Sequence, residues 1–356
     1  MKLVEASLTP YALPLRRPLA TAAGLINRRE GLVLRLVTED GVEGLGECAP
    51  LPGFSVLDLS GHRLALERLL PQLRGLELHP GDVPAFNLPP AAAFAVELAL
   101  WDNEGRRRGL SVARLLRPDA AAVVACSRLV RTAEEAVAAQ ADGVAMVKLK
   151  VAVESVSRDL ARVAALRALA PGLRLRLDAN RGWTMDEAQQ ALTGLAALGV
   201  ESVEEPLIGS DLAGLRALRA LGVPLLADES ARDEDDVARL IDAEAVDGLV
   251  LKPMFIGGLQ RSLTLAERAA AAGLSVVVTT ALDAAIGRAG ALHVAAACPQ
   301  GALWPCGLDT GGLLERDLFV SDRVIGGTIS PRGPGLGLVP LATACPAPRH
   351  AGSPTP

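Results

Sequence analysis

The sequence has few aromatic residues, and this limits the kinds of core that it can form. Phe, Trp and Tyr together make up 3% of its 356 residues, whereas half of all residues are apolar. The core must therefore consist mainly of Leu, Val and Ala, which suit a parallel sheet covered by Ala-rich helices better than a β-sandwich rich in aromatic side chains. We therefore expect an α/β protein.

Cysteine is also scarce, and its distribution argues against a zinc site. The cysteines are odd in number, widely scattered and without the short paired spacings of a zinc site. They stand at Cys48, Cys126, Cys298, Cys306 and Cys345. An odd, scattered set is typical of thiols in a reducing compartment, so we expect a cytoplasmic protein.

Long runs of one charge or of apolar residues are missing as well. Lys and Arg number 36 against 41 Asp and Glu, a net charge of −5, and the densest basic run is the triplet 106–108. No nucleic-acid partner is expected from such a distribution. The uncharged stretch 289–308 is interrupted by Pro299, and Glu5 and Pro10 interrupt the N-terminus. The sequence therefore predicts neither a membrane span nor a secretory signal.

The first 115 residues have the pattern of a compact α+β domain. Apolar runs that read as strands precede two helical patterns, Leu59–Leu73 and Ala91–Gly105. Long loops are predicted near 18–30 and 49–54, and such loops often have a function. We expect a Gly- and Pro-rich segment of about 311–340 to return to this domain, and the tail 341–356 to be disordered because it has little to bury.

Residues 116–310 show a different, regular alternation of strand and helix patterns. Short apolar runs begin roughly every 22 to 29 residues, the length of one strand with its crossover helix. The runs are 122–126, 146–150, 173–178, 202–205, 224–228, 248–252, 275–279 and 302–308. Eight such units predict a closed, TIM-like (β/α) barrel rather than an open sheet.

Three of these runs end in acidic residues that could share a metal ion. Asp178, Glu204 and Asp228 end three successive strands, and active sites of such barrels lie at the carboxyl ends of the strands. Three carboxylates at one point would repel one another without a cation, and oxygen-only ligation favours Mg²⁺ over zinc, with Mn²⁺ as a substitute. The sequence therefore predicts a magnesium site.

Three lysines complete the predicted site. Lys148 and Lys150 are two residues apart on one strand, so both point to the barrel axis, and Lys252 ends a strand across the barrel. An inward lysine beside another cation is expected to have a lowered pKa and to act as a base. This arrangement suits a small carboxylate substrate that loses the proton next to its carboxylate group.

These residues resemble the enolase superfamily, and within it the muconate-lactonizing-enzyme branch. The resemblance implies an N-terminal α+β capping domain on a (β/α)₇β barrel. It also implies that Lys150 and Lys252 are the acid/base pair and that Asp178, Glu204 and Asp228 are the metal ligands. The residues expected to contact the substrate or to support this set are Lys148, Asn180, Glu229, Thr279 and Thr280.

Within this branch, three segments look most like those of o-succinylbenzoate synthases: Gly44–Ser55, Gly307–Thr310 and Thr279–Asp283. The implied reaction is the syn dehydration of 2-succinyl-6-hydroxy-2,4-cyclohexadiene-1-carboxylate in menaquinone biosynthesis. N-succinylamino acid racemase, dipeptide epimerase and muconate cycloisomerase remain the alternatives. Dipeptide epimerases tend to carry an Asp-x-Asp pair near the last strand, where this chain has Asp309 alone. A homo-oligomer is compatible with the sequence, which does not set the oligomeric state.

The resemblance also assigns a role to the loop near residues 18–30. Gly24, Asn27, Arg28 and Arg29 would belong to a mobile capping loop that closes over the substrate. A cationic loop facing a dicarboxylate is electrostatically reasonable, and solvated arginines are the competing interpretation.

Overall fold

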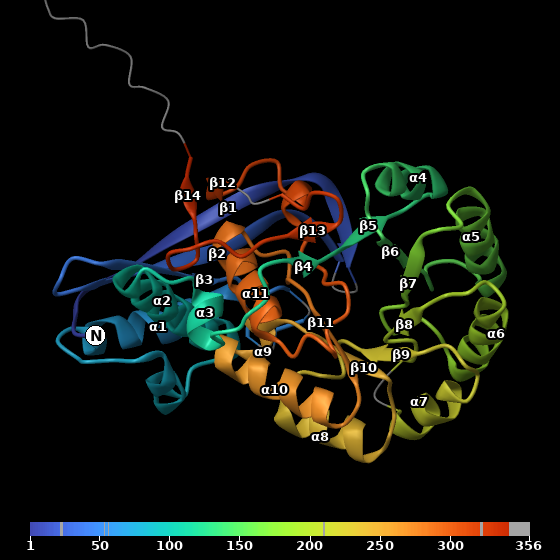
Figure 1. Ribbon diagram of the computed structural model, residues 1–356. Coiled ribbons are helices and arrows are strands. Elements are labelled where there is room, and N and C mark those ends of the chain that lie inside the picture. The colour runs from blue at the N-terminus through green and yellow to red at the C-terminus, as the bar shows by residue number, and fades with distance from the viewer. Residues whose placement is uncertain (22–23, 53, 56, 209–210, 321–322, 342–356) are drawn as a thin grey trace, which may run out of the picture.

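A computed structural model describes residues 1–21, 24–52, 54–55, 57–208, 211–320 and 323–341. Figure 1 shows an antiparallel sheet with helices beside it, next to a ring of strands surrounded by an outer layer of helices. The predicted disordered tail falls, from residue 342 onward, outside the described residues. None of the helices in the described part is long and apolar enough to cross a membrane.

The N-terminal part is built on a three-stranded antiparallel sheet. Its strands β1 (Leu3–Thr21), β2 (Gly24–Thr38) and β3 (Glu43–Cys48) lie in that order. Helix α2 (Pro90–Arg108) packs closely on β3, because Gly44 and Gly46 have no side chain: a Cβ atom at either position would meet a carbonyl oxygen of α2. The remaining elements are α1 (Leu59–Leu73), the 3₁₀-helix η1 (Pro80–Phe86) and α3 (Val112–Leu116).

The loop predicted near residues 18–30 is largely strand in the structure, which corrects that expectation. β1 and β2 stay paired as far as Thr21 and Gly24. Arg29 is 2% exposed, and its guanidinium donates to the carbonyls of Ala49, Pro50 (2.8 Å) and Leu282 (3.1 Å). Arg29 thus joins the capping sheet to the loop after β3 and to the barrel, because a buried guanidinium needs acceptors from several segments.

The second part is a (β/α)₇β barrel, which confirms the predicted fold. Strands β5 to β11 form one parallel sheet in sequence order. They are β5 (Ser127–Val130), β6 (Met146–Lys150), β7 (Arg174–Asp178), β8 (Ser202–Glu204), β9 (Leu225–Ala227), β10 (Gly248–Leu251) and β11 (Ser275–Val278). The helices that accompany them are α4 (Ala133–Ala141), α5 (Val156–Leu169), α6 (Met185–Ala196), α7 (Leu212–Arg219), α8 (Glu234–Asp242), α9 (Pro253–Ile256), α10 (Leu259–Ala271) and α11 (Ala285–Ala297).

The segment 302–308 closes the barrel between β11 and the start of β5. On one side the Val276 amide donates to Ala302 and the Gly307 amide donates to Val278, at 2.8 and 2.9 Å. On the other side the Ser127 amide donates to Cys306 at 2.9 Å. Both neighbours run parallel to this segment, so it serves as the eighth strand.

The first barrel strand differs from the prediction. The run 122–126 was expected to be that strand, but it contains β4 (Val124–Ala125), which pairs antiparallel with β13 (Thr328–Ile329). The barrel strand is β5, one step further along the chain, where Arg128 pairs with Asp309 across the barrel end. Apolar periodicity could not separate the two because they are nearly continuous in sequence.

The C-terminal segment returns to the capping domain. Glu315 donates from its backbone amide to Pro14 at 2.9 Å, and Leu336 donates to the buried Asp102 carboxylate at 2.8 Å. The short elements of this segment are η2 (Gly311–Leu313), β12 (Phe319–Val320), β13 and β14 (Val339–Pro340).

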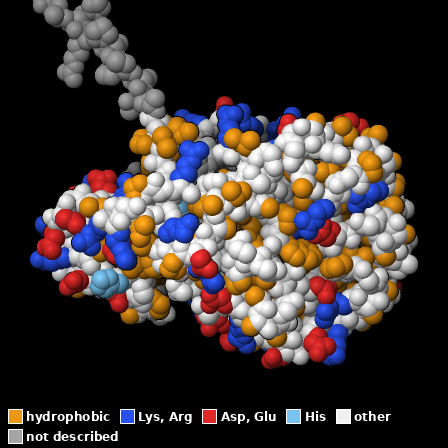
Figure 2. All heavy atoms as spheres, in the orientation of Figure 1, with side chains coloured by type: hydrophobic (Ala, Val, Ile, Leu, Met, Phe, Trp, Pro, Cys, Tyr) orange, Lys and Arg blue, Asp and Glu red, His pale blue; other side chains and the backbone are white. Residues whose placement is uncertain are grey.

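The charged side chains on one face and the cysteines of the described part can be located in the structure. On the face in Figure 2, acidic and basic side chains are interspersed rather than gathered into one basic field. The four cysteines in the described part, Cys48, Cys126, Cys298 and Cys306, are free and buried. Cys345 lies outside the described residues.

Candidate active site

The three predicted carboxylates lie at the carboxyl ends of adjacent parallel strands. Asp178 ends β7 and is in register with Glu204, which ends β8, and Asp228 directly follows β9. Their residues are 3%, 1% and 7% exposed. Burying three carboxylates so close together is costly unless cations compensate their charge. The site therefore requires compensating cations.

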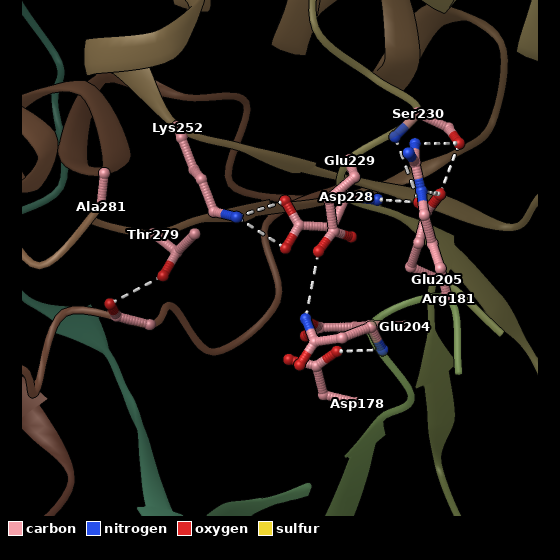
Figure 3. Close-up of polar contacts among 12 residues, drawn as sticks. Asp178, Arg181, Glu204, Glu205, Asp228, Glu229, Ser230, Lys252, Thr279 and Ala281 are labelled. Carbon is pink, nitrogen blue, oxygen red and sulfur yellow. Dashed lines mark hydrogen bonds and ion pairs between the residues drawn. The ribbon is translucent and has the colours of Figure 1, made fainter. Parts of the chain in front are cut away.

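In the structure, two lysine ammonium groups pair with these carboxylates. Lys148 Nζ contacts Glu204 and lies 2.8 Å from Asp178 Oδ2. Lys252 Nζ lies 2.7 Å from each carboxylate oxygen of Asp228, as Figure 3 shows. Among the residues that the structure describes, no three Asp, Glu, His or Cys side chains are gathered as a metal cluster. The carboxylates face the lysines instead of meeting at one point.

These contacts set the pKa values of the buried groups. Burial acts to lower the pKa of Lys148, but Asp178, Glu204 and Asp228 outweigh it, so this pKa is raised. The pKa of Lys252 is raised for the same reason, chiefly by Asp228. The lowered lysine pKa that the sequence suggested is therefore not seen at either position, because each ammonium faces carboxylates.

The donor set nevertheless fits a hard divalent cation. Asp178, Glu204 and Asp228 offer only oxygen ligands, which Mg²⁺ prefers. Nearby, Glu229 Oε1 accepts a hydrogen bond of 3.1 Å from Asn180, whereas Glu229 Oε2 is buried and has no hydrogen-bond partner among the described residues. Burial, and then the charge of Asp228, raise the pKa of Glu229 to about 7. A cation at this place would relieve both the unpaired oxygen and the mutual repulsion.

The structure places the other predicted residues in two groups. Lys150 ends β6, is half-buried and is in register with Asp178, beside the carboxylates. Thr279 and Thr280 lie at the end of β11, where Thr279 Oγ1 donates to the Gly307 carbonyl at 2.9 Å. The threonine hydroxyl is therefore engaged in closing the barrel.

Glu205 is a residue of the site that sequence reasoning missed. Its Oε2 accepts from the amides of Asp228 (2.8 Å) and Ser230 (3.2 Å), and its Oε1 accepts from Arg181 Nε (2.9 Å). In Figure 3 this cluster lies beside Asp228. Glu205 has a φ of 41°, a left-handed conformation that costs free energy and is common at functional sites. Glu205 thus positions Asp228 by holding its backbone.

We expect Glu205→Ala to lower the free energy of unfolding by about 2–3 kcal/mol, because it leaves two buried amides and the Nε of Arg181 without their acceptor. Urea unfolding measures this loss. The control Glu154→Ala removes an exposed partner of Arg158 and should cost less than about 0.5 kcal/mol. Equal losses in the two variants would contradict the positioning role.

Arg176 is a second residue that sequence reasoning did not include. It lies on β7 two residues before Asp178, so it points to the same inner side of the barrel. It is 1% exposed, with Nε 3.6 Å from Glu204 Oε1 and an Nη1 that donates to Pro305 at 3.1 Å. Burial lowers its pKa more than Glu204 raises it. Its place two residues before a strand-end acid was the signal that could have identified it.

At the barrel-closing segment 302–308, the acidic side chain that follows it, Asp309, is already paired. Arg128 Nε donates to Asp309 Oδ2 at 3.0 Å, which pairs the charge of Asp309. Two residues earlier, Gly307 packs against Thr279 so closely that an added Cβ would collide with its hydroxyl. No acidic side chain can stand at Gly307 without displacing Thr279.

The capping domain reaches the barrel through a buried carboxylate. Glu47 accepts from Tyr11 OH (2.7 Å) and from the amides of Ala284 and Gly287 (both 2.8 Å). These amides begin helix α11, whose N-terminus favours a negative charge. Burial and the charge of Glu47 together raise the pKa of the neighbouring Asp283 to about 7. The interface therefore joins the capping sheet directly to the end of β11.

Comparisons with known proteins agree with this architecture. Residues 3–117 match the model of the mandelate racemase/muconate lactonizing enzyme N-terminal domain, and residues 129–344 match that of the enolase C-terminal domain-like family. The L-Ala-D/L-Glu epimerase of Bacillus subtilis is 28% identical over 96% of this chain and 98% of its own length. Its substrate-liganded structure has a TM-score of 0.88, covering 96% of this chain and all of that one.

Two further relatives match different shares of this chain. An o-succinylbenzoate synthase of Mycobacterium ulcerans is 39% identical, but the match spans only 53% of this chain and 57% of that enzyme. A dipeptide epimerase of Enterococcus faecalis, solved with Mg and a dipeptide, is 26% identical, with a TM-score of 0.86 over 95% of this chain and all of that one. Both domain models and the full-length structural matches lead to one conclusion: this chain is an enzyme of the enolase superfamily and belongs to its muconate-lactonizing-enzyme branch.

Proposed function

We propose that this protein is a Mg²⁺-dependent o-succinylbenzoate synthase. It would dehydrate 2-succinyl-6-hydroxy-2,4-cyclohexadiene-1-carboxylate to o-succinylbenzoate and water, as a step of menaquinone biosynthesis. The partial match to o-succinylbenzoate synthases, at higher identity than the full-length match to an epimerase, supports this choice. We also propose that the protein acts in the cytoplasm, on a small carboxylate.

The observation that carries the proposal is the state of Asp309 and Gly307 at the barrel-closing segment 302–308. A dipeptide substrate has an ammonium group that needs a carboxylate partner, because a buried unpaired charge is costly. Here Asp309 is already paired with Arg128, and Gly307 leaves no room for an acidic side chain. The site therefore suits a substrate without an ammonium group, such as a succinylated cyclohexadiene acid.

The carboxylates are assigned to the metal. Asp178, Glu204 and Asp228 would hold Mg²⁺, which would neutralise the negative charge that develops on the substrate carboxylate. Asn180 and Glu229, joined by a hydrogen bond, would support the ligands from the side. Lys148 would help to balance the charge of Asp178 and Glu204.

The two remaining lysines carry the proton chemistry. Lys150 would remove the proton next to the carboxylate and then deliver it to the departing hydroxyl, so that the C–O bond breaks and water leaves from the same face. Lys252 would remain charged and stabilise the enediolate from the other side. One base therefore suffices for the dehydration, whereas racemisation needs a proton donor or acceptor on both faces.

A comparison of three substrate classes tests the proposed function. The purified protein with Mg²⁺ is given the cyclohexadiene acid, N-succinyl amino acids and L-Ala-D/L-Glu dipeptides in deuterated solvent. We expect rapid formation of o-succinylbenzoate and no deuterium incorporation into the dipeptides. Dipeptide epimerisation faster than dehydration would overturn the proposal, and racemisation without dehydration would identify an N-succinylamino acid racemase.

Lys252→Arg separates the two lysine roles. Arginine keeps the cation but cannot readily exchange a proton, so dehydration should fall by less than about tenfold, while any exchange into N-succinyl amino acids falls by more than about a hundredfold. The measured quantity is the ratio of the two rates. An equal loss of both activities would show that Lys252 transfers a proton in the dehydration.

A further inference from the structure

Two phenylalanines from different domains stack beside the active site. The chain has five Phe residues, and two of them, Phe54 and Phe255, face each other with ring centroids 6.2 Å apart and planes inclined by 17°. Phe54 belongs to the loop between β3 and α1 of the capping domain, and Phe255 belongs to α9 of the barrel. This stack joins the two domains at one edge of the site.

The ammonium group of Lys252 lies against both rings. Lys252 Nζ is 5.4 Å from the ring centroid of Phe54 and 5.8 Å from that of Phe255, within the range of a cation–π interaction. The same atom contacts both oxygens of Asp228. Its side chain is 15% exposed. The ammonium is therefore enclosed by a carboxylate and by two aromatic rings.

Local structure holds each ring in place. The amides of Phe54 and Ser55 both donate to the Leu51 carbonyl at 3.1 Å, and the Leu51 amide donates to Ser55 Oγ at 3.3 Å. This tight turn carries Phe54. On the barrel side, the Phe255 amide donates to the Lys252 carbonyl at 2.8 Å, so the lysine and its ring belong to one helical turn.

The start of the Phe54 loop is fixed to the barrel as well. The Ala49 amide donates to Met254 Sδ at 3.4 Å, and Arg29 bonds to Pro50 and to Leu282. Met254 lies in α9 between Lys252 and Phe255. The loop between β3 and α1 therefore contacts the turn that carries Lys252 at two places, Ala49 on Met254 and Phe54 on Phe255.

We propose that Phe54 is a positioning residue. Through its stack with Phe255, the loop between β3 and α1 holds the Lys252 ammonium at the edge of the active site. This inference rests on the proposed function only for the role of Lys252 in the reaction. The contact itself concerns the protein alone. The contact makes the placement of Lys252 depend on the loop between β3 and α1 as well as on the barrel.

Lysine labelling tests the contact without any substrate. The chain has four lysines, Lys2, Lys148, Lys150 and Lys252, so acetylation by acetic anhydride can be followed at each by mass spectrometry. With Mg²⁺ present, we expect Phe54→Leu to raise the labelling rate of Lys252 at least threefold and Phe54→Tyr to leave it unchanged. Lys2, which is exposed, serves as the internal reference. The matched control is Phe86→Leu, because Phe86 is a half-buried phenylalanine elsewhere in the capping domain.

The second measurement is the dehydration itself. Loss of the cation–π contact should lower kcat by about three- to thirtyfold in Phe54→Leu, with a smaller change in KM. Phe54→Tyr keeps an aromatic ring at this position and should retain the parent kcat. Unchanged Lys252 labelling in Phe54→Leu, or equal labelling in Phe54→Leu and Phe86→Leu, would overturn the proposal. If labelling changes as expected but the parent protein does not dehydrate the cyclohexadiene acid, the proposed function fails and the positioning role stands.

Discussion

We expect Lys150→Ala to abolish the dehydration, with kcat falling by about 10²- to 10⁴-fold, the usual contribution of a general acid or base. Lys150 is half-buried at the end of β6 and in register with Asp178, so its side chain stands beside the proposed metal ligands. One residue serves both proton transfers in the proposed reaction. Its loss therefore removes both. The measurement is the rate of o-succinylbenzoate formation at saturating Mg²⁺.

Lys2→Ala is the matched control for this variant. Lys2 is exposed and pairs with Glu39 at the surface, so the parent rate should be retained. The Mg²⁺ affinity of Lys150→Ala, measured by titration calorimetry, shows whether the metal site survives the substitution. A Lys150→Ala protein that dehydrates at the parent rate would refute the assignment of the base.

Removal of the metal is the second change with a large expected effect. EDTA should abolish dehydration, and Mg²⁺ or Mn²⁺ should restore it, because the buried carboxylates offer hard oxygen ligands. Glu204→Gln should weaken Mg²⁺ binding by at least about tenfold in titration calorimetry, since loss even of outer supporting groups costs that much. The variant should stay folded because Lys148 keeps Asp178 as a partner.

Asp119→Asn provides the control for the metal experiment. Asp119 is an exposed carboxylate in the connection between α3 and β4, and its loss should leave Mg²⁺ affinity unchanged. Dehydration at the parent rate in the presence of excess EDTA would exclude a metal-dependent reaction. Parent-like Mg²⁺ affinity in Glu204→Gln would remove Glu204 from the ligand set.

The barrel was predictable because its signals are local and repeated. Each strand is a short apolar run, and a polar residue such as Asp178 or Glu204 ends it. In parallel strands the ends meet at one edge, so periodicity alone places these side chains together. The same reasoning misplaced the first strand, because β4 and β5 are nearly continuous in sequence, and only the pairing of β4 with β13 and of β5 with β6 separates them.

By itself, the sequence determined the succession of strands and helices and the presence of acids and lysines at the strand ends, because apolar periodicity and strand alternation are properties of neighbouring residues. Only the tertiary structure decided which groups meet across distant segments. Arg29, which the resemblance placed in a mobile loop over the substrate, is instead buried in the fold because carbonyls from two other segments surround it. The pairing of Asp309 with Arg128 and the stack of Phe54 on Phe255 likewise join residues about 180 to 200 positions apart. Such contacts depend on how the capping domain and the closed barrel come together, which no local pattern encodes.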